Sequence, residues 1–268
     1  METVSLFKIP VARVTEPEAV EHIVALAREG RARRGHAAFV ATLNVDFVCN
    51  AVRGWPFGGN DELWGYLQKA DLVTADGMPI VLLSRIMFRG LPERVTGADM
   101  VPAICRRCAE EGLSVYVLGG FRKAVENAFE KLSADFGIPF RVAGIDPSFV
   151  KLDKDQPDII ERINAAKPDV LFVALGNPKQ ELWMGRNAAK LDIGVIIGVG
   201  GTFNFIAGRV KRAPKWVQRS GLEWIYRIIQ EPARLWRRYA YGLVKFSWLS
   251  LLSVFGAYGK CKERRDSK

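Results

Sequence analysis

Short runs of apolar, β-branched residues alternate with longer segments of helical periodicity over the first two hundred residues. The apolar runs predict strands at Ala38–Thr42, Leu72–Thr74, Ser114–Leu118, Phe140–Val142, Val170–Ala174 and Gly194–Val199. Helical patterns are expected at residues 16–29, 61–69, 78–88, 98–111, 121–135, 156–166 and 179–190. Strands that alternate with helices in this way predict an α/β fold with a largely parallel sheet flanked by helices.

The residues that follow the predicted strands are polar or rich in glycine. They are Thr42-Leu43-Asn44, Ala75-Asp76-Gly77, Gly119-Gly120, Ala143-Gly144, Gly176-Asn177-Pro178-Lys179-Gln180-Glu181 and Gly200-Gly201-Thr202. Ligands of open α/β sheets bind beyond the carboxyl ends of the strands, and glycines there let the backbone approach a ligand closely. Each glycine turn alone also fits a plain strand-to-helix connection. Together they predict a Rossmann-like crevice for a nucleoside diphosphate.

The familiar nucleotide fingerprints are absent from the chain. Gly198-Val199-Gly200-Gly201 lacks the third glycine of a dinucleotide-binding motif, and no phosphate-binding P-loop sequence is present. The sequence therefore disfavours a dehydrogenase and a P-loop nucleotidase.

The positive charge of the chain is concentrated near its C-terminus. The whole chain has 39 basic and 29 acidic side chains, and residues 205–268 hold 15 of the basic and four of the acidic ones. Basic charge with interleaved tryptophans is typical of proteins that bind nucleic acid or an anionic membrane surface. We therefore divide the chain into an α/β domain, residues 1–208, and a basic, aromatic-rich helical appendage, residues 209–268.

No segment has the length of a membrane-spanning helix. The stretch closest to a span, Phe246–Tyr258, has thirteen residues without a charge, whereas a span needs about 20. We expect an interfacial or buried helix there, no secretory signal at the N-terminus, and four reduced cysteines, including the Cys105–Cys108 pair.

Ordered motifs along nearly the whole chain resemble the WecG/TagA/CpsF family of bacterial glycosyltransferases. They are Thr42-Leu43-Asn44, Ala75-Asp76-Gly77-Met78-Pro79, Arg94-Val95-Thr96-Gly97, Gly176-Asn177-Pro178-Lys179-Gln180-Glu181, Gly198-Val199-Gly200-Gly201-Thr202-Phe203, Ala213-Pro214-Lys215-Trp216, Gly221-Leu222-Glu223-Trp224 and Gln230-Glu231-Pro232-Ala233-Arg234-Leu235.

The resemblance implies transfer of a hexose-type sugar from a UDP-sugar to a polyprenyl-diphosphate-linked saccharide. It further implies inversion at the anomeric carbon, no bound metal or other cofactor, and a peripheral position on the cytoplasmic face of the bacterial inner membrane, in cell-surface or exopolysaccharide assembly. Glucose, N-acetylmannosamine and its uronic acid all stay open as the donor sugar, and so do the acceptor saccharide and association into a homo-oligomer.

The family pattern assigns catalytic roles to five residues. Asp76 is the expected base for the acceptor hydroxyl, and its alternative role is to cap the helix that follows. Thr42 and Asn44 are expected to contact substrate, or to cap the next helix. Arg94 would clamp a diphosphate, or lie solvated on the surface. Gln180 would hydrogen-bond a sugar.

Two further residue sets carry expected binding roles. The nucleotide-sugar set is Gly119, Gly120, Gly144, Gly176, Pro178, Lys179, Gly198, Gly200, Gly201 and Asn204. Asn204 replaces the family's common aspartate, and Asp146-Pro147 replaces its usual Gly-Tyr-aromatic end, so both alter the pattern of the pocket. The membrane or diphosphate set is Arg212, Arg219, Arg227, Arg234, Arg237 and Arg238.

Three other interpretations of parts of the sequence were considered. Asp153-Lys154-Asp155 has the spacing of a metal-binding DxD triad, but it falls in a charged linker and is expected to be a solvated loop. The basic tail also fits a nucleic-acid-binding protein with a nucleotide-binding domain, although no helix-turn-helix, zinc-finger or RNP-like pattern appears. In a third alternative, the tail covers the core and its arginines are solvated.

Overall fold

The computed structural model describes residues 1–33, 36–87, 89–147, 150–152, 156–219 and 221–256. Its centre is a six-stranded, fully parallel sheet with the strand order β4-β3-β8-β7-β5-β6. The strands are β3 (Ala38–Leu43), β4 (Leu72–Ala75), β5 (Ser114–Gly119), β6 (Arg141–Asp146), β7 (Val170–Ala174) and β8 (Val195–Gly198). All six predicted strands are therefore present, and the α/β fold is confirmed.

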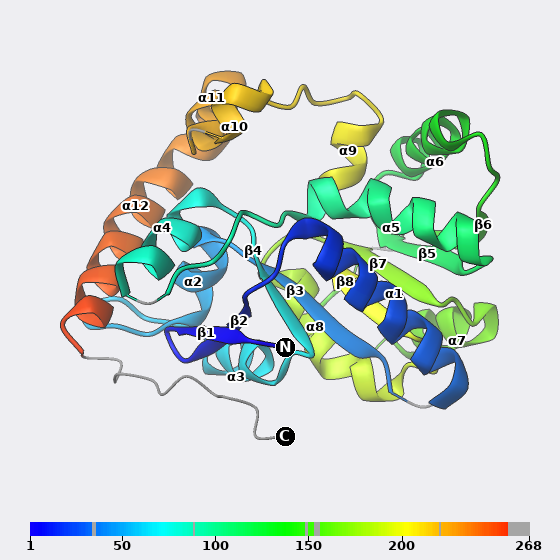
Figure 1. Ribbon diagram of the computed structural model, residues 1–268, viewed down its shortest axis with the longest axis horizontal. Coiled ribbons are helices and arrows are strands. Elements are labelled where there is room, and N and C mark those ends of the chain that lie inside the picture. Colours follow the sequence, from blue (N-terminus) through cyan, green and yellow to red (C-terminus); the bar gives the residue numbers. More distant parts are fainter. Residues whose placement is uncertain (34–35, 88, 148–149, 153–155, 220, 257–268) are drawn as a thin grey trace.

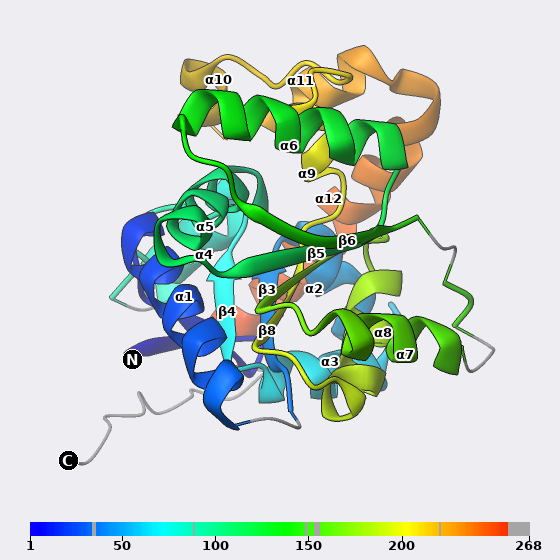
Figure 2. The same ribbon diagram turned by 90° about the vertical axis from the view of Figure 1, so that its right-hand side faces the viewer.

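Helices cover both faces of the sheet (Figures 1 and 2). One core cluster joins the sheet to α1 (Glu16–Arg33), α5 (Gly97–Glu111), α6 (Arg122–Phe136) and α9 (Thr202–Ile206). The other joins it to α2 (Val45–Ala51), α3 (Asp61–Lys69), α4 (Met78–Met87), α7 (Pro157–Ala166) and α8 (Lys179–Asn187). A short 3-10 helix, Ala188–Lys190, follows α8. Successive residues of β3 enter opposite clusters, as the period-2 geometry of a strand requires.

The predicted end of the fourth strand was wrong. The strand continues to Asp146, so Gly144 lies inside β6 rather than after it. A Cβ at Gly144 would stand 2.4 Å from the Tyr116 ring, so the glycine is needed there for packing against the neighbouring strand.

An antiparallel hairpin precedes the sheet and was not predicted. It consists of β1 (Thr3–Leu6) and β2 (Ile9–Ala12), joined by Phe7 and Lys8, which both have positive φ values, 53° and 64°. Turns of this kind favour glycine or asparagine. Here the Phe7 carbonyl accepts a hydrogen bond from the Trp64 indole, and the Phe7 side chain is buried. Tertiary packing therefore holds a turn that the local sequence does not favour.

The C-terminal segment forms three helices. They are α10 (Lys215–Arg219), α11 (Glu223–Gln230) and α12 (Pro232–Val254). Pro232 starts a new helix, as expected of a residue that lacks an N–H donor. Figure 1 shows α12 running along one side of the molecule, and it packs against α2 and α4. The division of the chain into two domains at residue 208 stays a prediction.

Polar and apolar contacts both hold α12 on the core. Phe246 and Leu249 are buried, and the ring of Phe246 meets that of Phe7 edge to face at 6.1 Å. The ammonium group of Lys245 is buried and donates to the carbonyls of Cys49 and Gly58. Burial lowers the pKa of Lys245 because it disfavours the charged form. Helix α12 is thus a component of the hydrophobic core.

Two expectations about the chain concern its cysteines and its helices. Cys49, Cys105 and Cys108 are buried thiols, which confirms ordinary reduced cysteines at these positions. None of the helices in the described ranges combines the length and the apolar character that crossing a membrane requires.

If α12 belongs to the core, replacing the buried Leu249 by alanine will destabilise the protein far more than the same replacement of the exposed Leu251. Leu249 is fully buried, whereas Leu251 is 52% exposed. We expect Leu249→Ala to lower the free energy of unfolding by about 2–5 kcal/mol and Leu251→Ala by less than about 0.5 kcal/mol. Urea denaturation measures both, and equal values for the two variants would contradict this packing.

Candidate active site

A cavity of about 750 Å³ lies at the carboxyl edge of the sheet, within the usual size range of ligand sites. Residues that follow β3, β4, β7 and β8 line one part of it, and residues of α9, α11 and α12 line another. The sequence-predicted residues found in its wall are Thr42, Asn44, Asp76, Arg94, Gly176, Gln180, Gly200, Gly201, Asn204, Arg212, Arg227 and Arg238. The prediction of a crevice at the strand ends is therefore confirmed.

Asp76 stands directly after β4. Its backbone N–H donates to the Leu43 carbonyl, which ties the end of β4 to the end of β3. Its carboxylate makes no hydrogen bond with a described residue, so the helix-capping role considered for it is not observed there. Gly77 has a φ of 142°, a conformation that side chains rarely adopt, and it leaves open space beside the carboxylate.

The surroundings of Asp76 favour its neutral form. Burial raises the pKa of Asp76 to about 6, although the positive charges of Arg227 and Arg94 act in the opposite direction. A carboxyl group with a pKa near the working pH is suited to accept a proton from a hydroxyl group. Other carboxylates in the cavity wall, Asp46 and Glu223, are instead paired with arginines.

The two residues at the end of β3 have different local roles. Thr42 is buried, and its hydroxyl lies 3.5 Å from the Gly198 carbonyl, across the β3–β8 junction. Asn44 accepts a hydrogen bond from the Phe47 N–H at 3.2 Å and so caps α2. The capping alternative for Asn44 is therefore the observed contact, and both side chains border the cavity.

Gln180 holds two strand-end loops together. Its side-chain oxygen accepts from the Gly176 N–H at 3.1 Å and from the Gly200 N–H at 3.0 Å. A Cβ at Gly198 would lie 2.6 Å from its side-chain nitrogen, so this glycine makes room for the amide. Gln180 thereby fixes the loops after β7 and β8 at the cavity floor.

Glu181 is a fully buried carboxyl group beneath this floor. One of its oxygens accepts from the Asn177 amide at 2.9 Å, and Asn177 in turn accepts from Asn50. Burial raises the pKa of Glu181 to about 7, against the lowering effect of the hydrogen bonds from Gln180 and Asn177. Glu181 belongs to one of the motifs that resemble the family, but that resemblance assigned it no role.

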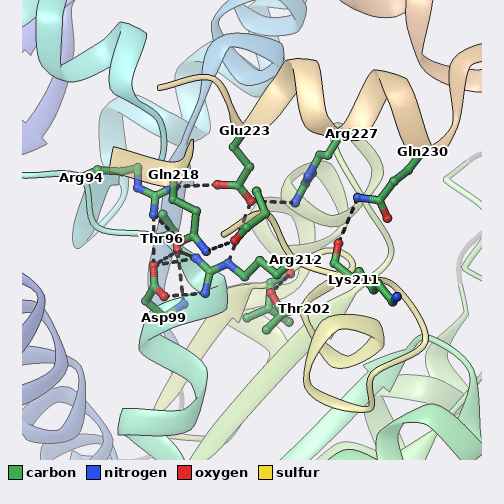
Figure 3. A network of polar contacts seen from close by, with 12 residues as sticks. Arg94, Thr96, Asp99, Thr202, Lys211, Arg212, Gln218, Glu223, Arg227 and Gln230 are labelled. Carbon is green, nitrogen blue, oxygen red and sulfur yellow. Dashed lines mark hydrogen bonds and ion pairs between the residues drawn. The ribbon is translucent and has the colours of Figure 1, made fainter. Parts of the chain in front are cut away.

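Arg94 belongs to a charge network with the C-terminal segment rather than to the solvated surface (Figure 3). Its guanidinium donates to the Glu223 carboxylate at 2.7 Å and to the Gln218 side chain at 3.1 Å. The side chains of Arg94 and Glu223 are only 16% and 19% exposed, so this pair is more strongly coupled than a surface ion pair. The solvated alternative for Arg94 was wrong.

A second arginine extends the network. Arg212 donates through two nitrogens to both oxygens of Asp99, which lies in the first turn of α5. Burial opposes ionisation of Asp99, but the hydrogen bonds and charge of Arg212 outweigh it and lower the pKa of Asp99. Figure 3 shows Arg94, Arg212, Asp99 and Glu223 converging between α5 and α11. Glu223, Gln218 and Asp99 had no predicted role, since their pairing needs segments over a hundred residues apart.

The other arginines of the predicted membrane or diphosphate set separate into three groups. Arg227 and Arg238 line the cavity, and Arg238 pairs with Asp46. Arg237 lies outside it, 5.4 Å from the ring centre of Trp236. The side chains of Arg219 and Arg234 are not among those that the structure describes.

Several other predicted binding residues are not in the cavity wall. Gly119 ends β5 and Gly120 follows it. Pro178 precedes α8, which Lys179 begins. Gly198 makes room for the Gln180 side chain, and Gly144 is needed for packing within β6. The possible DxD triad, residues 153–155, lies outside the described part of the chain.

Comparison with known proteins agrees with these motifs. The model of the glycosyl transferase WecG/TagA/CpsF family matches residues 4–259. An N-acetylglucosaminyldiphosphoundecaprenol N-acetyl-beta-D-mannosaminyltransferase of Bacillus spizizenii is 32% identical over 202 residues, which cover 75% of this chain and 74% of the relative. A protein of the same name from Bacillus subtilis is 28% identical over 201 residues, with the same coverage. With a match over almost its entire length, the chain belongs to the WecG/TagA/CpsF family and is a glycosyltransferase.

Proposed function

We propose that this enzyme transfers N-acetylmannosamine from a UDP-sugar to a polyprenyl-diphosphate-linked N-acetylglucosamine in the assembly of a cell-surface polymer. The names of the Bacillus relatives support this acceptor and this sugar. The observation that carries the proposal is the carboxylate of Asp76, which has no hydrogen-bond partner among the described residues and borders a cavity lined with arginines at the carboxyl edge of the sheet.

In the proposed reaction Asp76 takes the proton of the acceptor hydroxyl. The hydroxyl oxygen attacks the anomeric carbon from the face opposite the UDP group, and the bond to the diphosphate breaks in the same step. The products are the inverted glycoside, UDP and a protonated Asp76. The raised pKa of Asp76 suits this role because it lowers the cost of protonation as the attack proceeds.

Arginines are the proposed partners of the departing diphosphate. Arg94, Arg209, Arg212, Arg227 and Arg238 all line the cavity. Fixed guanidinium groups stabilise negative charge that develops on phosphate oxygens, and they bind such oxygens in a bidentate manner. We propose on this ground that the reaction runs without a bound metal.

We further propose that the enzyme binds the cytoplasmic face of the membrane peripherally through α12 and its neighbours. Val244, Leu251 and Phe255 are 60%, 52% and 83% exposed, and Trp55, 84% exposed, is tied to α12 by a hydrogen bond from Trp248 to its carbonyl. Exposed aliphatic and tryptophan side chains next to basic residues are typical of interfacial segments. A lipid-linked acceptor would approach the cavity from this side.

The direct test is a transfer screen. Purified enzyme is incubated with UDP-N-acetylmannosamine, its uronic acid or UDP-glucose, and with a polyprenyl-diphosphate-N-acetylglucosamine acceptor. We expect a lipid-linked disaccharide from UDP-N-acetylmannosamine only. If only UDP-glucose gives product, the transferred sugar is glucose and not N-acetylmannosamine. If none of the donors gives product, the proposed function is wrong. A salt-sensitive shift with RNA or DNA, without vesicle binding, would favour the nucleic-acid alternative.

Removal of the proposed base should abolish turnover but not donor binding. We expect Asp76→Asn to lower kcat by about 10²–10⁴-fold, the usual contribution of a general base, while the Kd for UDP stays within about threefold. Wild-type kcat/KM should fall about tenfold per pH unit below about pH 6, because protonated Asp76 cannot accept a proton.

The pH dependence of kcat/KM, measured for wild type and both variants, tests this acidic limb, the fall in kcat/KM below about pH 6. Glu181→Gln is the control for the other raised carboxyl group, and it should keep the acidic limb that Asp76→Asn loses. Near wild-type kcat for Asp76→Asn would eliminate Asp76 as the base.

Membrane binding should depend on the exposed apolar side chains of α12. We expect the double substitution Val244→Asp and Leu251→Asp to lower the affinity for anionic phosphatidylglycerol vesicles, measured by co-sedimentation, at least about tenfold. In the wild type both apolar side chains would be transferred from water into the membrane interface, and aspartate cannot make that transfer favourably. The pair Ile138→Asp and Val142→Asp, 40% and 39% exposed on another part of the surface, adds the same charge as a control. Equal vesicle binding by the two double variants would refute this surface.

A further inference from the structure

One carboxylate of the C-terminal segment stands among three arginines of the cavity wall (Figure 3). One oxygen of Glu223 lies 2.7 Å from the Arg94 guanidinium. Its other oxygen lies 3.9 Å from a nitrogen of Arg212 and 3.8 Å from one of Arg227. The Glu223 side chain is only 19% exposed and borders the cavity itself. A single acid is thus ion-paired with three of the guanidinium groups that are proposed to bind the diphosphate.

The two oxygens of this carboxylate have different environments. The oxygen that faces Arg94 accepts a hydrogen bond. The other oxygen is almost equally distant from Arg212 and Arg227, and both distances exceed that of a hydrogen bond. In agreement, Nε of Arg212 is buried and has no hydrogen-bond partner among the described residues. Glu223 therefore attracts these two guanidinium groups by charge without occupying the donors that face it.

Local backbone features place Glu223 beside the loop that carries Asp76. Glu223 is the first residue of α11, where the helix dipole favours a negative charge. The turn before α11 contains Gly221, which has a φ of 78°, and a Cβ there would stand 2.9 Å from the Met78 side chain. Glycine is therefore required at this contact. Because Met78 lies two positions after Asp76, the contact brings the start of α11 to the start of α4.

The charged side chains that act on Asp76 come from the region of α5 and from the C-terminal segment. They are the positive Arg94, Arg212 and Arg227 and the negative Asp99 and Glu223. Positive neighbours favour the charged form of a carboxyl group, and negative neighbours favour its neutral form. Without Glu223, Asp99 alone would oppose the arginines of this set. Asp76 would then bind a proton less tightly and would be a weaker base.

We propose that Glu223 is a positioning residue of the transfer reaction. It holds Arg94, Arg212 and Arg227 at one edge of the cavity, and its charge keeps Asp76 basic enough to take the proton of the acceptor. Glu223 itself takes no proton and touches no reacting atom. The inference rests on the proposed function, because it assumes that Asp76 is the base and that the arginines bind the diphosphate.

NMR of the carboxyl carbons measures the proton affinity of Asp76 without any turnover. Protein labelled at the aspartate carboxyl carbons is titrated with acid, and the Asp76 signal is assigned by its absence from Asp76→Asn. We expect Glu223→Gln to lower the pKa of Asp76 by about 0.5–1 pH unit, less than the effect of a charge in direct contact. Glu223→Asp should keep the wild-type pKa, because it keeps the charge. Arg94→Gln, the opposite change in the same ion pair, should raise it.

The same change should appear in the kinetics of transfer. In Glu223→Gln the acidic limb of kcat/KM should move to lower pH by the same amount. The plateau value of kcat should fall about threefold, as expected of a base that is weaker by about one pKa unit. Asp46→Asn is the matched control, because it also removes an acid paired with an arginine of the cavity wall, but this pair joins α2 to α12. It should leave the limb at its wild-type pH.

A purely structural clamp would give a different result. Glu223→Gln would then lose activity or thermal stability while Asp76 kept its wild-type pKa, and this outcome would overturn the inference but not the proposed function. Equal pKa shifts in Glu223→Gln and Asp46→Asn would overturn it too, as would an unchanged pKa in Arg94→Gln. A wild-type enzyme that transfers no sugar would instead refute the proposed function, and the NMR titration would still decide whether Glu223 acts on Asp76.

Discussion

The parallel arrangement of β4, β3, β8 and β7 is the constraint on which the site depends. The carboxyl ends of these four strands meet at one edge, because Leu43 pairs with Ala75 and Val173 with Gly198. A register shift of one residue would turn Thr42 away from its partner and separate Asp76 from the glycine loops. Residues from distant parts of the sequence converge at the cavity only because the sheet fixes these ends together.

Opposite charges join the C-terminal segment to this edge. The segment carries most of the excess positive charge of the sequence, yet Arg212 and Arg238 are neutralised by Asp99 and Asp46 of the α/β part. Conversely, Glu223 of the segment neutralises Arg94. The division of charge along the sequence is thus not a division in space. Three of the arginines in the cavity wall, Arg94, Arg212 and Arg238, are held in place by acidic side chains.

The sequence predicted what local patterns determine. Six strands, their order along the chain and the cavity position of Asp76 and Gln180 were accessible, because strand periodicity and strand-end residues are local signals. Asn204 was expected at the pocket only from the family resemblance. The hairpin of β1 and β2 was not, since its turn uses Phe7 and Lys8 instead of glycine or asparagine. The family motifs identified Arg94 but not its contact with Glu223, because that contact joins residues 129 positions apart.

Two other results show what local sequence signals could not predict. Asn44 and Asp76 both stand between a strand and a helix, and both could cap; only Asn44 is observed to do so. Helix α12 was expected to be interfacial or buried from Phe246 onward, whereas Lys245 and the arginines before it were assigned to a basic appendage. Its burial depends on carbonyl groups of α2 and the following loop, which no pattern within α12 reveals.

The burial of Lys245 and Leu249 has a consequence for how the enzyme can be dissected. A shortened chain that ends before α12 would leave the carbonyls of Cys49 and Gly58 without their donor and would expose the Phe7 region to water. Loss of activity in such a chain would mix a folding defect with a missing cavity wall. Genetic or biochemical work on the roles of the C-terminal helices is therefore better done with single surface substitutions than with deletions.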